Sequence, residues 1–381
     1  MMTEQAKVPA IRFAGFTDPW EQRKASEVFQ IVDDRGHPTL PVLSATQNQG
    51  MIYRDDSGRY IGHDESNEIG YKRVLPGDFV VHLRSFQGGF AHSQYEGITS
   101  PAYTVFRAKE PTSHSDRFWK HWFMSEHFIA GLSTVTYGIR DGRSISVDEF
   151  MNTFLAFPAV EEQAAISRLF DYLDDLITLH QRKYDKLVIF KKSMLEKMFP
   201  KDGESVPEIR FAGFTDPWEQ RKASEVFQIV DDRGHPTLPV LSATQNQGMI
   251  YRDDSGRYIG HDESNEIGYK RVLPGDFVVH LRSFQGGFAH SQYEGITSPA
   301  YTVFRAKEPT SHSDRFWKHW FMSEHFIAGL STVTYGIRDG RSISVDEFMN
   351  TFLAFPAVEE QAAISRLFDY LDDLITLHQR K

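Results

Sequence analysis

The sequence contains no cysteine, and this absence excludes several kinds of chemistry. Disulfide bonds, thiolate zinc sites, iron–sulfur clusters and cysteine nucleophiles all need that residue. The chain also lacks a run of about 18 apolar residues, the length that a membrane-spanning helix requires. Its polar first ten residues lack the apolar region of a secretory signal. We therefore expect a cytoplasmic protein that acts without a membrane.

The familiar catalytic and cofactor-binding motifs are missing as well. The patterns G-x-x-x-x-G-K-[ST], G-x-G-x-x-G, H-E-x-x-H and G-x-S-x-G do not occur. Nothing matches the Asn-Pro-Pro-aromatic motif with which amino-methyltransferases hold a target base, a glycine-rich adenosylmethionine loop, or the spaced carboxylates and lysine of a restriction nuclease. We therefore predict a chain without catalytic residues, metal ligands or a bound cofactor. If it takes part in DNA chemistry, the catalytic groups lie on another chain.

What the chain does contain is an identical internal repeat. Residues 11–183 recur letter for letter as residues 209–381, at a constant offset of 198 positions. Surface positions normally tolerate substitution, so an undiverged copy is either recent or engineered. Residues 184–200 have no second counterpart, because the repeat stops at Lys381. Any function of the chain must therefore be a function of two copies.

The formal net charge of −10 would by itself disfavour nucleic acid, whose phosphates reward lysine and arginine. The charges are unevenly distributed, since residues 55–68 are acidic and residues 69–109 are basic. Either one face of the domain is basic, or the charges are scattered over a solvated surface. The basic stretch carries Lys72, Arg73, Arg84, Arg107 and Lys109 against Asp78 and Glu96.

A long helix is predicted from residue 160 to residue 199. This stretch contains neither glycine nor proline, and its apolar residues recur at steps of three and four. About 40 residues at 1.5 Å each give a helix of about 60 Å. Its start is marked by Pro158 and by Glu161 and Glu162, which suit the positive end of the helix dipole.

The second repeat predicts a shorter helix, which begins after Pro356 and reaches Lys381. Each amphipathic stripe would be exposed without a partner helix. We expect the two helices to pair with each other in antiparallel orientation. In that pair, His180 and His378 are expected to be residues of the seam rather than metal ligands.

The rest of each repeat predicts an α+β domain with short strands. Residues 77–84 and 102–107 are rich in β-branched and aromatic residues and read as strands, and residues 118–132 read as a core helix. The spacing of three nearby histidines does not place them on one helical face for a metal. We interpret them as structural residues: His114, His121 and His127.

Three polar, glycine-containing loops, at residues 44–50, 84–89 and 137–144, carry side chains suited to reading base edges. Amides bind adenine bidentately, and glycine permits a tight turn. One such loop is usually only a turn, but three in one domain favour DNA contact. The candidate DNA-binding residues of the first repeat are Gln47, Asn48, Gln49, Lys72, Arg84, Gln87, Arg140 and Arg143. Their images are Gln245, Asn246, Gln247, Lys270, Arg282, Gln285, Arg338 and Arg341.

Several segments resemble those of a known family. The predicted helix resembles the conserved helical region of type I restriction-modification specificity subunits, through PAVEEQAAI (158–166), LDDLITLHQRK (173–183) and KKSMLEKMFP (191–200). The lead into a target recognition domain of that family is similar to IRFAGF (11–16) and WEQRK (20–24), and GIRDGR (138–143) resembles one of its loops.

The resemblance implies an architecture for the whole chain. Two globular α/β-type target recognition domains would be separated by long antiparallel coiled-coil helices, with pseudo-two-fold symmetry. The domains would be target recognition domain 1 (residues 1–157), conserved spacer helix 1 (158–200), target recognition domain 2 (201–355) and a truncated conserved spacer helix 2 (356–381).

The resemblance also implies a function in the bacterial cytoplasm. It implies a non-catalytic subunit that reads a bipartite site in double-stranded DNA, recruits two modification (methyltransferase) subunits, and is joined later by restriction subunits. S-adenosylmethionine, and ATP with Mg for restriction, would bind to those partners and not to this chain. Because its two domains are identical, we predict a palindromic interrupted target.

The second helix departs from the family pattern. Lacking a counterpart of residues 184–200, it is 17 residues shorter, or about 25 Å. We expect modification subunits still to dock, with the far end destabilised or able to recruit a second specificity chain. A stand-alone DNA-binding or helical scaffold protein is the alternative, and an enzyme is the reading that the missing motifs disfavour most. The target sequence, the spacer length and the methylated base stay open.

Overall fold

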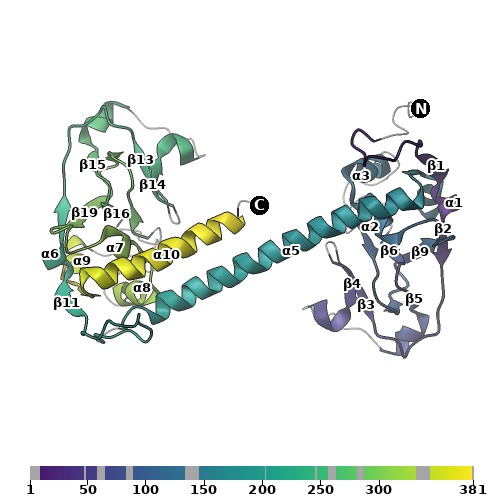
Figure 1. The fold of residues 1–381 in the computed structure, drawn as a ribbon, viewed down its shortest axis with the longest axis horizontal. Coiled ribbons are helices and arrows are strands. Elements are labelled where there is room, and N and C mark those ends of the chain that lie inside the picture. The colour runs from purple at the N-terminus through teal and green to yellow at the C-terminus, as the bar shows by residue number, and fades with distance from the viewer. Residues whose placement is uncertain are drawn as a thin grey trace. The chain divides into compact units, whose positions relative to one another are not determined.

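Figure 1 shows the computed structural model of the chain. The chain divides into two compact units, Met1–Leu176 and Ile177–Lys381, and each is described by itself. Both combine short strands with helices, so the predicted α+β class is confirmed. The structure describes residues 9–46, 49–57, 65–82, 89–133, 146–201, 203–244, 247–255, 263–280, 287–331 and 344–379.

The first unit contains mostly short elements followed by one long helix. In chain order they are β1 (Glu21–Lys24), α1 (Ala25–Val28), β2 (Phe29–Val32), β3 (Leu43–Thr46), β4 (Gly50–Tyr53), the 3-10 helices η1 (Arg54–Ser57) and η2 (Glu65–Gly70), β5 (Lys72–Val74), β6 (Phe79–Val81), β7 (Phe90–His92), β8 (Gly97–Thr99), β9 (Thr104–Ala108), α2 (Asp116–Met124), α3 (Glu126–Ser133), α4 (Val147–Asn152), β10 (Phe154–Phe157) and α5 (Val160–Lys197), which continues into the second unit.

The second unit repeats this order. Its elements are β11 (Glu219–Lys222), α6 (Ala223–Val226), β12 (Phe227–Val230), β13 (Leu241–Thr244), β14 (Gly248–Tyr251), η4 (Arg252–Ser255), η5 (Glu263–Gly268), β15 (Lys270–Val272), β16 (Phe277–Val279), β17 (Ala289–His290), β18 (Gly295–Thr297), β19 (Thr302–Ala306), α7 (Asp314–Trp320), α8 (Glu324–Ser331), α9 (Val345–Asn350), β20 (Phe352–Phe355) and α10 (Val358–Gln379).

The main sheet of the first unit has the strand order β2-β9-β6-β7, and its strands pair antiparallel. The pairs β3-β4, β5-β8 and β1-β10 form smaller sheets. Side chains along a strand alternate between its two faces, and β6 shows the consequence. Phe79 and Val81 belong to the core that contains α2, whereas Val80 belongs to a second core with Leu43 of β3 and Met51 of β4. Both faces of the sheet are therefore buried.

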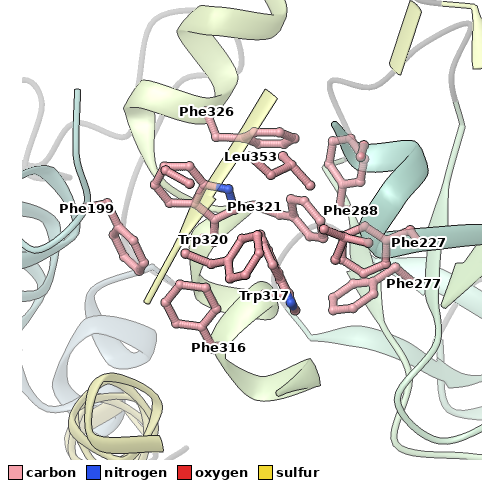
Figure 2. Packing of buried hydrophobic residues seen from close by; sticks show 14 of the residues in the cluster. Phe199, Phe227, Phe277, Phe288, Phe316, Trp317, Trp320, Phe321, Phe326 and Leu353 are labelled. Carbon is pink, nitrogen blue, oxygen red and sulfur yellow. The ribbon is translucent and has the colours of Figure 1, made fainter. Parts of the chain in front are cut away.

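Aromatic rings fill the core between the sheet and α2. The ring centroid of Phe29 lies 5.3 Å from that of Phe106 and 5.2 Å from that of Trp119, both edge-on. Such contacts add to the hydrophobic gain from burial. Figure 2 shows the same packing in the second unit, where Phe227 and Trp317 take the places of Phe29 and Trp119.

The predicted strands are confirmed as β6 and β9, but the helix predicted over residues 118–132 is interrupted. Ser125 has extended backbone angles (φ −68°, ψ 139°) and ends α2. Its hydroxyl donates to the carbonyl of Trp122 (2.7 Å) and accepts from the amide of Phe128 (3.3 Å). A serine side chain that bonds locally to the backbone competes with the helix. The prediction was therefore wrong about continuity, and two helices, α2 and α3, stand in its place.

The long helix is confirmed as α5, with 38 residues. Its first turn is fixed to the first unit by buried polar side chains. Glu162 pairs with Arg12 at 2.6 Å, and the side chain of Gln163 accepts the amide of Ser115 at 2.9 Å. These bonds hold the first turn of α5 in a defined position on the first unit.

In the second unit, α10 packs beside the part of α5 that lies there (Figure 1). His180 contacts His378, Lys191 pairs with Asp372, and the ring of Phe199 stacks on that of Phe368. Positions that rise along α5 meet positions that fall along α10, so the helices are antiparallel. The predicted pairing and the seam position of the two histidines are confirmed. No helix in the described residues is both long enough and apolar enough to cross a lipid bilayer.

Candidate nucleic-acid interface

Of the candidate DNA-binding residues, the structure describes Gln49 and Lys72 with their images Gln247 and Lys270. These four are therefore the ones whose surroundings can be compared with the prediction. The others lie outside the described residues: Gln47, Asn48, Arg84, Gln87, Arg140, Arg143, Gln245, Asn246, Arg282, Gln285, Arg338 and Arg341.

Gln49 lies at the end of the β3-β4 hairpin, and a threonine fixes the backbone there. Thr46 pairs with Gly50 in the strand register. The Thr46 hydroxyl donates to the Gly50 carbonyl (2.8 Å) and accepts from the Gln49 amide (3.1 Å). Gly50 has a φ of +71°, and a Cβ there would clash with the His92 carbonyl, so only glycine fits this turn. The side chain of Gln49 is exposed and free to reach a ligand.

Lys72 lies at the start of β5 and is turned partly inward. Its ammonium donates to the Tyr103 carbonyl at 2.8 Å. Burial lowers the pKa of Lys72, the nearby Asp33 raises it, and Arg35 lowers it further. The same bond, at 2.8 Å, links Lys270 to the Tyr301 carbonyl in the second unit. Lys72 therefore supports the fold, whatever further contact it makes.

The sequence left open whether residues 69–109 form a basic face or carry scattered charge, and the described cations of this stretch have partners within the fold. Arg73 pairs with Glu96 at 2.5 Å, and the Lys109 ammonium donates to the Ser26 carbonyl at 2.7 Å. Arg107 pairs with Asp78 at 2.7 Å. The two acidic residues of the basic stretch are thus partners of two of its arginines. A count along the sequence could not reveal these pairs, because they join different strands and loops.

Asp78 is buried, and burial raises its pKa. Its carboxylate accepts the Leu75 amide at 2.8 Å in addition to the Arg107 guanidinium. These bonds lower the pKa of Asp78 without cancelling the effect of burial. The Asp78–Arg107 pair fixes the turn before β6 to β9, which is a structural role.

A serine, a histidine and an aspartate meet in the first unit, but their bonds do not form a proton relay. The Nε2 atom of His92 lies 2.7 Å from an oxygen of Asp116. The neighbouring Ser93 hydroxyl donates its proton to the Tyr95 carbonyl at 2.8 Å. A nucleophilic serine needs its hydroxyl bonded to the histidine that accepts its proton. This arrangement therefore gives no support to an enzymatic reading.

His121 belongs to a charged cluster that sequence spacing missed. Its Nε2 lies 3.0 Å from Asp171, and Asp174 completes a group whose ligand atoms lie within 4.8 Å of one another. The two aspartates lie on α5, some 50 residues away in the sequence, so helical spacing around His121 could not indicate them. The Lys120 ammonium lies 3.0 Å from Asp174 and 3.6 Å from Asp171, so a positive charge of the protein itself already pairs with both carboxylates.

Of the other two histidines of this region, the structure describes the side chain of one, His114. His114 is buried, with its ring 4.9 Å from that of Phe157 and 6.0 Å from that of Trp119, as expected of a structural residue. The side chain of His127 lies outside the described part of the structure.

Comparison with known proteins gave two sequence relatives from Methanocaldococcus jannaschii. The chain is 24% identical over 251 residues to the type I restriction enzyme MjaVIII specificity subunit, a match that covers 61% of this chain and 58% of that protein. It is 18% identical over 391 residues to the putative type I restriction enzyme MjaX specificity subunit, covering 96% of this chain and 89% of that one. No family model matches the sequence.

A solved structure resembles the fold, and a second was compared with it. The S subunit of a type I restriction-modification system from M. genitalium aligns with a TM-score of 0.51 at 9% identity, covering 98% of this chain and 94% of that one. The HsdS subunit of Thermoanaerobacter tengcongensis aligns with a TM-score of 0.48 at 16% identity, covering 96% and 93%. The sequence relatives carry the assignment, and the resemblance predicted from the helical motifs is confirmed: this chain is a homologue of the specificity subunits of type I restriction enzymes.

Proposed function

We propose that this chain reads DNA sequence as the non-catalytic specificity subunit of a type I restriction-modification complex. One observation carries the proposal: an identical repeat in a chain whose match to the MjaX specificity subunit extends over 96% of its length. A duplicated domain gives a duplicated reader, which is what a bipartite site needs. The match to the MjaVIII subunit covers only 58% of that protein. The activity and partners that its name indicates are therefore proposed for this chain.

The repeat determines the kind of target. Two identical domains read identical half-sites, and when a two-fold axis relates them those half-sites lie on opposite strands. The target is then palindromic, with a spacer that neither domain reads. A chain with two different recognition domains would have an asymmetric target instead.

The exposed amides of Gln49 and Gln247 support direct reading of bases. An amide side chain bonds adenine bidentately at N6 and N7 in the major groove. The hairpin that presents Gln49 is held by the Thr46 hydroxyl, so the amide is presented on a fixed backbone. The candidate arginines, with Lys72 and Lys270, would contact phosphates or guanines.

Methylation and cleavage belong to other subunits in this proposal. The chain recruits two modification subunits, which bring S-adenosylmethionine, and restriction subunits, which bring ATP and Mg. The missing catalytic motifs and the bonds of Ser93 and His92 support a role confined to recognition and assembly.

The test is to reconstitute the chain with matched modification subunits and to sequence the methylome of a cell that expresses both. We expect one methylated motif that is palindromic and interrupted. An asymmetric motif would contradict the two-reader geometry. DNA binding by the chain without any restored methylation would favour the alternative, a stand-alone DNA-binding or scaffold protein.

A further inference from the structure

The hairpin that presents Gln49 is attached to the neighbouring strand β7. Gly50 lies so close to the carbonyl of His92 that a Cβ on Gly50 would clash with it. Met51 of β4 and Ala91 of β7 are buried in the same core. The backbone beside Gln49 is therefore held in place by β7, and by His92 in particular.

The side chain of His92 connects β7 to helix α2. It is 8% exposed, and its Nε2 atom lies 2.7 Å from an oxygen of Asp116, the first residue of α2. The carboxylate accepts this hydrogen bond, which lowers the pKa of Asp116 although burial opposes the shift. The same bond, at 2.7 Å, joins His290 to Asp314 in the second unit. The strand that supports the hairpin is therefore bonded to the start of an adjacent helix in both units.

Helix α2 is in turn fixed along α5. The side chain of Gln163 accepts the amide of Ser115, the residue before α2, at 2.9 Å. Farther along both helices, Asp171 of α5 lies 3.0 Å from His121 and 3.6 Å from Lys120. The charged cluster around His121 therefore holds α2 against α5, and α2 connects α5 to the strand that supports the hairpin.

The second unit repeats this series of contacts. Gln361 of α10 accepts the amide of Ser313 at 2.9 Å, and a Cβ on Gly248 would clash with the carbonyl of His290. The contacts therefore belong to the domain itself, and they form whether the helix that carries the domain is α5 or α10.

We propose that the His92–Asp116 bond, with its image in the second unit, positions the hairpin that reads DNA by holding it at a fixed orientation to the helix of its own unit. This role rests on the proposed function and adds to it the residues that orient the reading side chain. A bidentate bond between an amide and adenine is directional, and binding sites tolerate errors of only about 0.5 Å and 10–20°. A hairpin released from α2 would still meet DNA, but at variable angles to the bases.

A fixed hairpin also favours one separation between the two half-sites. Each hairpin is bonded to the helix of its own unit, so the tolerated number of base pairs between half-sites depends on how rigid both attachments are. Loss of the bond should therefore weaken the preference for the motif over unrelated DNA, and the preference for one spacer length. Contacts with phosphates carry no sequence information and should change less.

Three paired variants separate this role from a general effect on the fold. Asp116→Ala with Asp314→Ala removes the acceptor. Asp116→Asn with Asp314→Asn removes the same charge from the first turn of the helix but keeps an acceptor, so it should preserve the orientation. Asp34→Ala with Asp232→Ala is the matched control. It removes a histidine–aspartate contact of similar length, His37–Asp34 at 2.8 Å, whose residues lie outside β3, β4, β7 and α2.

The first measurement is hydrogen exchange in the intact chain without DNA. Amides of β4 and β14 should exchange about two- to fivefold faster in the alanine variant, the range expected for loss of one partly exposed ion pair. The asparagine variant and the control should exchange at the rate of the chain without substitutions. An alanine variant with unaltered exchange in these strands would overturn the positioning role, whatever the DNA measurements give.

The second measurement is fluorescence anisotropy of the intact chain with three labelled duplexes. They carry the motif found by methylome sequencing, the same half-sites with a spacer one base pair longer, and an unrelated sequence. The ratio of the affinity for the motif to that for each other duplex should fall about 4- to 25-fold in the alanine variant, the product of the losses in two units. A role confined to stability would instead reduce the folded fraction and weaken binding of all three duplexes alike.

The outcomes separate this role from the function on which it rests. Faster exchange with unchanged affinity ratios would overturn the positioning role and leave the proposed function intact. If the chain without substitutions shows no preference among the duplexes, both are wrong. Should Asp116→Ala not fold, His92→Phe with His290→Phe removes the same hydrogen bond while keeping a ring beside Phe79, whose ring centroid lies 5.3 Å from that of His92.

Discussion

His180 and His378 occupy the same position of the two repeats, and their Nδ1 atoms lie 2.9 Å apart. In an antiparallel pair of identical helices, a residue that meets its own image marks the local centre of the pairing. The contact therefore sets the register between α5 and α10. From this point the pairing extends to Phe368, near the middle of α10, whose ring stacks on that of Phe199 just after the end of α5.

The histidine contact gives the first prediction. Replacing both residues with leucine removes two polar groups at once and supplies the apolar seam that paired helices favour. His180→Leu combined with His378→Leu should therefore leave the free energy of unfolding unchanged or raise it. The measurement is urea unfolding followed by circular dichroism. A clear loss of stability would show that the imidazole hydrogen bond itself is needed for the register.

The second prediction compares identical residues in different surroundings. Phe368→Ala should lower the free energy of unfolding by about 3–5 kcal/mol, because the ring is wholly buried and leaves a cavity. Phe170→Ala should cost less than about 1 kcal/mol, because its ring is already half exposed. Urea unfolding of the two variants measures both values. Equal costs would mean that another part of the chain covers Phe170 in solution.

The elements with the strongest local signals were predictable from the sequence, and those that depend on long-range contacts were not. The absence of glycine and proline and the spacing of apolar residues predicted α5, including its start at Val160. The break at Ser125 was missed because one serine inside an apolar helix pattern is ordinarily tolerated, and its capping bonds to Trp122 and Phe128 are visible only in the structure.

The candidate site shows the same division. Gln49 was predicted to contact DNA from its turn; the structure shows that its side chain is exposed, and the contact itself stays a prediction. The charge count left open whether residues 69–109 form a basic face, and it could not show that Arg73 and Arg107 pair with the only two acids of that stretch, Glu96 and Asp78. Such pairs depend on how strands and loops are brought together, which one sequence does not specify.

The third prediction concerns pH. Burial opposes ionisation of Asp369, but the hydrogen bond from His319 and the nearby positive charges more than offset it and lower the pKa of Asp369 to about 2. An unfolded aspartate has a pKa of about 3.9. A carboxylate whose pKa is lower in the folded state stabilises the fold at pH values above its pKa in the unfolded chain. That contribution is lost as pH falls from about 4 through about 2.

Asp369→Asn should therefore lower the free energy of unfolding at pH 7 by about 1–2 kcal/mol, allowing for partial solvent exposure. The difference between the variant and the unchanged chain should shrink as pH falls from 4 to 2. Glu359→Gln, at an exposed position in the first turn of α10, is the control and should change stability little. Urea unfolding at several pH values gives the comparison. A difference that stays constant across this range would contradict the assigned shift.

The fourth prediction separates base reading from phosphate contact. Gln49→Ala with Gln247→Ala should cost about 1–3 kcal/mol of binding free energy for each lost base contact and should relax the sequence preference. The paired change Gln30→Ala with Gln228→Ala, on exposed positions of β2 and β12, is the control. Fluorescence anisotropy with the methylated motif and with unrelated DNA measures both effects.

Lys72→Ala with Lys270→Ala should behave differently, because each ammonium also donates to a carbonyl of the fold. Losing that hydrogen bond should lower the free energy of unfolding by about 1 kcal/mol for each unit. If the lysines also contact phosphate, affinity should fall equally for all DNA sequences, and the slope of log K against log salt should decrease by about 1 for each lost contact. A loss of stability with an unchanged salt slope would assign Lys72 a structural role alone, and would leave phosphate contact to other residues of the recognition surface.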